Sequence, residues 1–433
     1  MRRHRSFTVA SPLRFKEALL AWSKKQHHIV WLDSNGHTDK YGSFDAILAI
    51  SAQTDMSKNT INTIDKMNDF IDKKKDWLFG YFTYDLKNDL EDLKSTNHDG
   101  LGFPKIHFFQ PEKIITIKAD QISFRYLDSY AKEIEKDYAE VKTFDPVNKS
   151  ERKSQQAIRI KLRIHKDAYF EKIKSLLEHI HRGDVYEANF CQEFYSENTT
   201  IDPLQTYENL NAISKPPFAS FLRMNDKYLL CGSPERYLKK MGQTVISQPI
   251  KGTAARGSDA YEDEKLKAEL ENDEKEQAEN VMITDLVRND LSKSALPGSV
   301  KVTELCKVYT FEQVHQMIST VVSKVPKNQN PIELIMDTFP MGSMTGAPKI
   351  SAMKIIEVLE ETKRGLYSGA VGYFDPEGNF DFNVIIRSIL YNASKKYVSF
   401  SVGSAITAKS NPEKEYQECL LKAKAMRSVL EGS

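Results

Sequence analysis

Cysteine is scarce in this chain of 433 residues, and its four copies lie far apart, at Cys191, Cys231, Cys306 and Cys419. None belongs to a CxxC motif, and no cluster of histidine and cysteine offers a zinc site. The scarcity argues against a disulfide framework and is typical of a protein that stays reduced inside the cell. We therefore predict a cytoplasmic location.

An excess of charge is also missing, because 61 basic residues face 60 acidic ones and the formal net charge is +1. This balance gives no support for a nucleic-acid partner. No apolar run approaches the ~18 residues that a membrane-spanning helix requires, so no membrane association is expected. Residues 1–15 are basic but contain no apolar segment, which argues against a secretory signal.

Apolar residues are plentiful, since 40% of the chain is hydrophobic and 10% aromatic, which is ample for a large core. Residues 1–150 alternate short strands with helices and predict an N-terminal α/β subdomain that completes a sandwich. The best linker candidate is the polar stretch 143–156 (TFDPVNKSERKSQQ). A larger catalytic domain is then expected over 160–430. We expect the N-terminal third to have a filled core.

The larger domain mixes long helices with pairs of strands. Residues 367–391 predict a β-hairpin whose turn is Asp-Pro-Glu-Gly at 375–378, and 397–410 predict a further strand that Gly403 interrupts. A helix is expected over 165–182, with Gly183 at its end. The pattern favours an α+β fold with antiparallel sheet over a doubly wound nucleotide fold.

The stretch 247–257 (SQPIKGTAARG) places one lysine among small residues. Residues 244–250 predict a strand, because they are rich in β-branched side chains, and Gly252 allows backbone or ligand to come close. Lys251 is therefore expected at a strand end, where loops on a rigid scaffold often hold functional side chains. A solvated surface lysine is the alternative, and on burial statistics alone it is the commoner one.

Two predicted helices, one over 275–291 and one that begins after Asn411, place acidic side chains next to an apolar stripe. Each has two glutamates three residues apart, which therefore share a face: Glu276 and Glu279, and Glu415 and Glu418. A carboxylate beside an apolar stripe must be paired, protonated or bound to a cation. Such oxygen ligands suit Mg²⁺. Solvated glutamates that pair with lysines are the alternative.

A glycine-containing loop leads into a third predicted helix, which Pro348 opens and Gly365 ends. The free N–H groups of such a helix start can receive an anion. A carboxylate is the better candidate than a triphosphate, because Gly342 and Gly346 are not followed by the Gly-Lys-Ser/Thr of a P-loop. A plain capped helix is equally compatible with the pattern.

Taken together, these stretches resemble the chorismate-utilising enzymes, in family order from about residue 165 onward. The segments that match are SPERYL (233–238), PIKGTAARG (249–257), AENVMITDLVRNDLSKSA (278–295), GSMTGAPKISAMKIIE (342–357), RGLYSGAVGYFDPEGNFDFNVIIRSI (364–389) and SVGSAITAKSNPEKEYQE (401–418). The resemblance implies an anthranilate synthase component I-like fold, with antiparallel sheets packed together and helices outside. It also implies that 160–430 bind chorismate and that Mg²⁺ is the cofactor.

Within this family the lysine at 251 is similar to that of the aminodeoxychorismate synthases, whereas anthranilate synthases have PIAGT in this place. The resemblance implies that Lys251 adds to C2 of chorismate, the C4 hydroxyl leaves, and ammonia then enters at C4. An amine attacks only when uncharged, so we expect a pKa well below the ordinary value of about 10.4. Glu235 would be the general acid, with a raised pKa and partial burial. Without the resemblance, an ion pair of Glu235 with Arg236 or Lys239 on the surface is the alternative.

The resemblance assigns the other site residues as well. Glu279 and Glu418 resemble ligands of Mg²⁺, with Glu276 and Glu415 beside them, and the ion would hold the C1 carboxylate of chorismate. Tyr367 and Arg387 would hold the enolpyruvyl carboxylate together with residues 403–405. The full set of implied substrate-binding residues is Gly252, Thr253, Ser343, Tyr367, Arg387, Gly403, Ser404, Ala405 and Lys422.

Two positions differ from the family pattern, and we leave the roles of their side chains open. Glu187 stands where such synthases usually have glutamine, and where isochorismate and salicylate synthases have a lysine that activates water. Gln316, directly after His315, stands where the family often has histidine. The missing lysine at 187 argues against isochorismate and salicylate chemistry.

No cysteine lies on a sequence typical of a glutaminase elbow. We therefore expect a separate glutamine amidotransferase to supply ammonia, and a second enzyme to release pyruvate on the route to p-aminobenzoate and folate. Two alternatives stay open. One is anthranilate synthase component I, against which Lys251 argues. The other is a non-catalytic regulatory or binding subunit.

Overall fold

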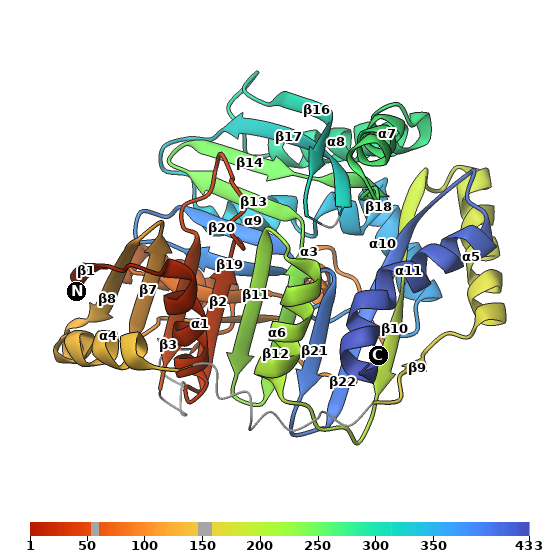
Figure 1. The fold of residues 1–433 in the computed structure, drawn as a ribbon. Coiled ribbons are helices and arrows are strands. Elements are labelled where there is room, and N and C mark those ends of the chain that lie inside the picture. Colours follow the sequence, from red (N-terminus) through yellow and green to blue (C-terminus); the bar gives the residue numbers. More distant parts are fainter. Residues whose placement is uncertain (53–59, 146–157, 313, 433) are drawn as a thin grey trace.

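The computed structural model describes residues 1–52, 60–145, 158–312 and 314–432, and folds them into two packed antiparallel sheets with helices outside (Figure 1). This confirms the predicted α+β class. The predicted linker 143–156 lies outside the described residues beyond its first three positions. No described helix is long and apolar enough to cross a bilayer.

The first sheet combines strands from both ends of the chain. Its spatial order is β1 (Arg2–Thr8), β8 (Gln121–Leu127), β7 (Lys113–Lys118), β3 (Ala46–Ser51), β2 (His28–Asp33), β11 (Phe218–Met224), β12 (Lys227–Ser233), β21 (Ser388–Asn392), β22 (Tyr397–Thr407), β10 (Glu187–Ser196) and β18 (Gly346–Ala347), with β9 (Lys161–Leu162) beside β10. The C-terminal strand β22 and the mid-chain strand β10 therefore lie near the opposite end from β1.

The second sheet also combines strands from distant parts of the chain. Its order is β15 (Ile250–Ala255), β17 (Val314–Lys324), β14 (Thr244–Gln248), β13 (Arg236–Met241), β20 (Phe380–Val384), β19 (Ala370–Phe374), β5 (Leu78–Phe82), β6 (Ile106–Phe109) and β4 (Thr60–Ile61), with β16 (Lys301–Thr310) also paired to β17. Strands of the N-terminal third thus enter both sheets, and a domain boundary near 150 stays a prediction.

The helices form outer layers on the two sheets. Their bounds are α1 (Pro12–Ser23), α2 (Ile64–Lys74), α3 (Lys87–Leu90), α4 (Ile134–Thr143), α5 (Lys166–Arg182), α6 (Pro203–Ser214), α7 (Ala260–Glu271), α8 (Glu274–Ser292), α9 (Pro331–Thr338), α10 (Lys349–Leu359) and α11 (Pro412–Glu431). In Figure 1, α7 and α8 lie beside β16 and β17, above α10, α11 and β10. The predicted helices over 165–182, 275–291 and after Asn411 are confirmed as α5, α8 and α11.

Strand alternation separates the interior into two cores. In β2, Ile29 and Trp31 pack against helices on the outer face, whereas Val30 packs between the two sheets. This is the two-residue period of a strand that is covered on both faces. A cavity of about 320 Å³ opens beside Asp33 and Arg236, lined by residues of both sheets, and the expectation of a filled N-terminal core stays a prediction.

Candidate active site

A cavity of about 540 Å³ opens where β15 and α8, at one end of the second sheet, meet β22 and α11 of the first. Of the residues predicted for the site, Ser404 and Glu415 do not line it. Those that do are Lys251, Glu235, Gly252, Thr253, Ser343, Tyr367, Arg387, Gly403, Ala405, Lys422, Glu276, Glu279 and Glu418. Residues as far apart in sequence as Glu235 and Lys422 are thereby brought to one cleft.

Lys251 lies on a β-bulge. The pairing of β15 with β17 shifts between Ile250 and Thr253, and such an extra residue bends a strand and redirects its side chains. Gly252 in the bulge has φ +94°, and a side chain there would come within 3.1 Å of Met317 Cβ. Lys251 therefore stands inside a strand and not, as predicted, at a strand end, and the glycine after it is a steric requirement.

Helix α8 holds this bulge in place. The buried Asn280 amide donates hydrogen bonds to the carbonyl oxygens of Lys251, at 3.2 Å, and Met317, at 3.0 Å. The same helix presents Glu276 and Glu279 to the cleft. The lysine and the two carboxylates are thus positioned by one rigid contact between a helix and an edge strand.

The Lys251 ammonium is surrounded by acids. Its Nζ donates to Glu187 Oε1 at 3.0 Å, and its side chain is 13% exposed. Burial lowers the pKa of Lys251, but the carboxylates of Glu187, Glu279 and Glu235 outweigh burial and raise it above its ordinary value. The expected depression of this pKa is therefore wrong for the protein without substrate, because no pattern in the sequence predicts that Glu187 lies against the lysine.

Glu235 is 5% exposed, and its Oε1 accepts a hydrogen bond from Ser343 Oγ at 2.7 Å. Burial raises the pKa of Glu235 to about 7, although Ser343 and Lys251 oppose the shift. The predicted rise is confirmed, and burial is more complete than expected. The surface pair with Arg236 is excluded, because that guanidinium instead bonds to Asp381 at 3.0 Å.

The predicted metal ligands lie near one another without forming a ready-made cluster: in the described chain, no group of three or more His, Cys, Asp or Glu side chains stands close enough to hold a metal. Burial raises the pKa of Glu279 to about 7 and also raises that of Glu276. Burial has the same tendency at Glu418, but Lys422 outweighs it and lowers the pKa, through an ion pair of 2.5 Å.

The donor set nevertheless fits a hard divalent cation. Glu279 Oε1 is buried and accepts no hydrogen bond from the described residues, and the Lys275 ammonium is 3.6 Å away. Burial lowers the pKa of Lys275, yet the four predicted ligand carboxylates together raise it. Carboxylates gathered around one cationic position, with an unsatisfied oxygen among them, are what Mg²⁺ prefers.

Another part of the cleft is suited to a carboxylate. Arg387 lines it beside Tyr367, and burial lowers the pKa of the Arg387 guanidinium. Among the described residues this guanidinium has no recorded hydrogen bond or ion pair, so its paired N–H donors are available to an anion. Lys422 Nζ, which pairs with Glu418, also donates to the Gly403 carbonyl at 3.0 Å.

Strand β22 runs unbroken from Tyr397 to Thr407, so the predicted interruption at Gly403 is wrong. No larger residue fits at position 403, because a Cβ there would come 2.6 Å from Cys191 Sγ. Gly403 and Ala405 face the cleft, whereas the Ser404 side chain, 1% exposed, points to the other side of the strand. Glu415 is likewise buried outside the lining, with 4% exposure.

The loop before α10 contributes to the site, but the helix does not. Ser343 and Met344 line the cleft, and no residue of α10 does. The helix ends at Leu359, so the predicted extension to Gly365 is wrong. The interpretation of its first turn as an anion site therefore finds no support, and the loop is the part that matters.

A buried ion pair between Arg364 and Glu360 holds the loop that contains Ser343 and Met344. Arg364, 5% exposed, bonds to Glu360 through Nη2 at 2.7 Å and donates to the carbonyls of Met344 at 2.6 Å and Asn189 at 2.7 Å.

Arg364→Met is expected to lower the free energy of unfolding by about 3–5 kcal/mol, because it leaves a buried carboxylate unpaired. Urea unfolding measures this. The double variant with Glu360→Gln should recover much of the loss, and an unchanged midpoint for the single variant would contradict the account.

Several residues that line the cleft were not predicted from the sequence. Asn189 and Lys275 line the cleft; Asn189 follows Glu187 by two positions in β10, a period that a strand prediction would have revealed. Of the two positions left open, Gln316 lines the cleft. His315 bonds to Asp263 at 3.0 Å and is not part of the lining.

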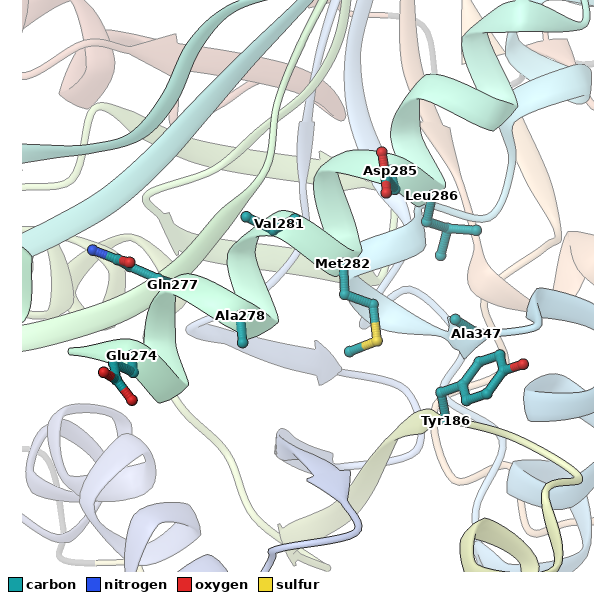
Figure 2. A pocket seen from close by; sticks show the side chains of 9 residues that line it. All are labelled: Tyr186, Glu274, Gln277, Ala278, Val281, Met282, Asp285, Leu286 and Ala347. Atoms are coloured by element: carbon teal, nitrogen blue, oxygen red, sulfur yellow. The ribbon is translucent and has the colours of Figure 1, made fainter. Parts of the chain in front are cut away.

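A second hollow, of about 740 Å³, lies on the outer side of α8. Figure 2 shows Met282 pointing toward Tyr186 and Ala347, with Glu274 and Asp285 at the two ends. None of the predicted site residues lines it. Helix α8 therefore separates this outer hollow from the cleft that holds Lys251.

The sequence profile of the family described as "chorismate binding enzyme" matches residues 27–428. Among curated proteins, the "Probable aminodeoxychorismate synthase, chloroplastic" of Oryza sativa is 41% identical over 269 residues, 61% of this chain but 30% of that protein. "Anthranilate synthase component 1" of Saccharolobus solfataricus is 40% identical over 267 residues, 62% of this chain and 63% of that protein. The chain thus spans less than two thirds of either relative.

"Aminodeoxychorismate synthase component 1" of Bacillus subtilis is 32% identical over 364 residues, which are 82% of this chain and 77% of that protein. Among solved structures, anthranilate synthase component I from Streptococcus pneumoniae has a TM-score of 0.75 at 24% identity and covers 98% of this chain and 92% of its own. The menaquinone-specific isochorismate synthase from Escherichia coli has a TM-score of 0.77 at 16% identity, with 99% and 95% covered. These likenesses confirm the predicted fold.

Proposed function

Since the chain belongs to the family of chorismate binding enzymes, we propose that it is the synthase component that converts chorismate and ammonia into 4-amino-4-deoxychorismate. The product would serve p-aminobenzoate and folate synthesis. The observation behind this choice is the Lys251 ammonium, which lies in the cleft within hydrogen-bonding distance of Glu187 and in the field of Glu235 and Glu279. An amine so placed is a candidate nucleophile.

The proposed reaction has two halves. In the first, Lys251 Nζ bonds to C2 of chorismate while the C4 hydroxyl departs with a proton from Glu235. In the second, ammonia bonds to C4 and displaces the lysine. A general acid must hold its proton near neutral pH, and the raised pKa of Glu235, about 7, supports this role.

The two carboxylates of chorismate would lie at opposite sides of the cleft. Arg387 and Tyr367 would bind the enolpyruvyl carboxylate, helped by the backbone of residues 403–405 and by Lys422. Gly252, Thr253 and Ser343 would complete the wall around the ring. This orientation would place the ring between Lys251 and Glu235, which is what the first half-reaction needs.

Mg²⁺ would be held by Glu279 and Glu418, with Glu276 and Glu415 beside them. A bound divalent ion offsets carboxylate charge and orients the C1 carboxylate of the substrate.

We expect Glu279→Gln to weaken Mg²⁺ binding by at least about tenfold, as measured by titration calorimetry on the protein alone. Glu274→Gln, on the outer side of the same helix, is the control and should bind as the wild type does. Equal affinity in Glu279→Gln would refute this ligand set.

A separate glutamine amidotransferase would supply ammonia, as the names of the "component 1" relatives suggest. The four cysteines are free, and Cys191, Cys231 and Cys419 are buried. Burial raises the pKa of Cys191 to about 12, which is unlike a glutaminase nucleophile. Four free cysteines, three of them buried, are compatible with a reduced cytoplasmic protein.

Anthranilate synthesis is the second candidate, because the Saccharolobus solfataricus relative has that name. The two activities give different products from the same substrates. Purified protein is incubated with chorismate, Mg²⁺ and ¹⁵N-ammonium, and the products are separated by mass. The proposal requires ¹⁵N-labelled 4-amino-4-deoxychorismate. Fluorescent anthranilate would establish the second candidate, and no turnover at saturating ammonium would indicate a binding subunit.

A further inference from the structure

We infer that Glu187 is the proton acceptor that frees the Lys251 amine for attack on C2. This inference rests on the proposed function and assigns a chemical role to the carboxylate that the sequence left without one. It concerns a step that any lysine nucleophile must take before it forms a bond, because an ammonium has no lone pair.

The position of Glu187 is fixed from both sides. In β10 its backbone lies opposite Thr407 of β22 and Ala347 of β18. Its side chain is 1% exposed and lies on the cleft side, where Oε1 accepts from Lys251 Nζ at 3.0 Å. A general base must be within hydrogen-bonding reach of the proton it removes, at about 2.6–3.2 Å, and this contact meets that requirement.

The second oxygen of Glu187 is also informative. Oε2 is buried and has no hydrogen-bond partner among the described residues. A buried acceptor without a donor is costly, most of all on a charged carboxylate. A carboxyl group that has received a proton from Nζ is neutral and tolerates a dry site better than the carboxylate does.

The other acids near Lys251 are engaged elsewhere. Glu235 bonds to Ser343 and has its own proton to deliver to the departing hydroxyl. Glu279 forms its ion pair with Lys275 rather than with Lys251. In the described part of the chain, Glu187 is therefore the one carboxylate hydrogen-bonded to the nucleophilic nitrogen.

The step balances as follows. One N–H bond of the Lys251 ammonium breaks, and its proton goes to Glu187 Oε1. The nitrogen lone pair then bonds to C2, the C1=C2 pair moves to C1–C6, and the C5=C6 pair moves to C4–C5. The C4–O bond breaks and its electron pair leaves with the hydroxyl, which takes a proton from Glu235. No oxidant, reductant or further reactant is needed.

The test compares Glu187→Gln with Glu187→Asp, and uses the exposed Glu197, further along the same segment, as the matched control through Glu197→Gln. Two quantities are measured on each protein at pH 7. The first is the rate of 4-amino-4-deoxychorismate formation with ammonium. The second is the rate at which cyanate, a small reagent for uncharged amines, modifies Lys251, followed by peptide mass spectrometry.

Removal of a general base lowers a rate by roughly 10²–10⁴-fold, and we expect a loss of this size in Glu187→Gln. Cyanate should modify Lys251 more slowly in that variant than in the wild type, because the carboxylate that takes the proton from the amine is gone. Amination by Glu187→Gln should recover as pH rises, since bulk base then removes the proton. Glu187→Asp should retain part of the activity, and Glu197→Gln all of it.

Wild-type amination in Glu187→Gln would overturn the inference. A loss of amination with cyanate modification at or above the wild-type rate would also overturn it, because the amine would then lose its proton without Glu187, and Glu187 would only hold the lysine in position. The wild type is assayed in the same series. Anthranilate as its product would overturn the proposed function itself, and this outcome is visible before any variant is compared.

Discussion

Lys251→Ala is expected to lower the rate of 4-amino-4-deoxychorismate formation by roughly 10³-fold or more at saturating chorismate and ammonium. The variant has no nitrogen to bond to C2, so the C4 hydroxyl must leave without covalent assistance. A slow residual rate is expected, because ammonia can attack C4 directly. The rate is measured by mass detection of the product, with ammonium instead of a glutaminase so that subunit contact does not enter.

Lys265→Ala is a suitable control, since the Lys265 side chain is 63% exposed on α7 and should leave the rate unchanged. The Lys251→Ala protein must also bind chorismate, which equilibrium dialysis can measure. A variant that binds chorismate and aminates C4 within a few-fold of the wild-type rate would show that Lys251 is not the nucleophile.

The second large effect is expected for Glu235→Gln, with a loss of roughly 10²–10⁴-fold in the rate of the first half-reaction. Glutamine has nearly the same shape and can still accept from Ser343 Oγ, which now bonds to Oε1 at 2.7 Å. The variant therefore removes the transferable proton and little else. A rate unchanged from that of the wild type would exclude Glu235 as the general acid.

The pH dependence gives an independent reading of Glu235. Burial raises its pKa to about 7, so the carboxyl group is protonated below that pH and ionised above it. As the donor of a proton it is active in the protonated form. The rate of hydroxyl departure should hence fall as pH rises through about 7, and Glu235→Gln should lack this fall. A profile for the wild type that rises through the same range would contradict the assignment.

Local sequence signals predicted much of the secondary structure. Helix α5 ends at Gly183, whose φ of +85° is the left-handed conformation that favours glycine. Asn411 caps α11 by accepting from Lys414 N at 3.1 Å, as its place before Pro412 indicated. These signals succeed because they depend on residues only a few positions apart.

Contacts between distant segments could not be predicted in the same way. The pKa of Lys251 depends on Glu187, which is 64 residues earlier in the chain and joins it only through the packing of two sheets. The bulge at Gly252 depends likewise on the partner strand β17. Most site residues were assigned through the family resemblance, and their convergence on one cleft agrees with it, whereas Ser404 and Glu415 lie outside the lining.

The covalent bond between Lys251 and chorismate is tested most directly by trapping it. The wild-type protein is incubated with chorismate and Mg²⁺ without ammonium, quenched in acid, digested and analysed by mass spectrometry. We predict that the peptide containing Lys251 gains the mass of chorismate less one water. An unmodified Lys251 peptide, from a preparation that aminates C4 once ammonium is added, would contradict the account.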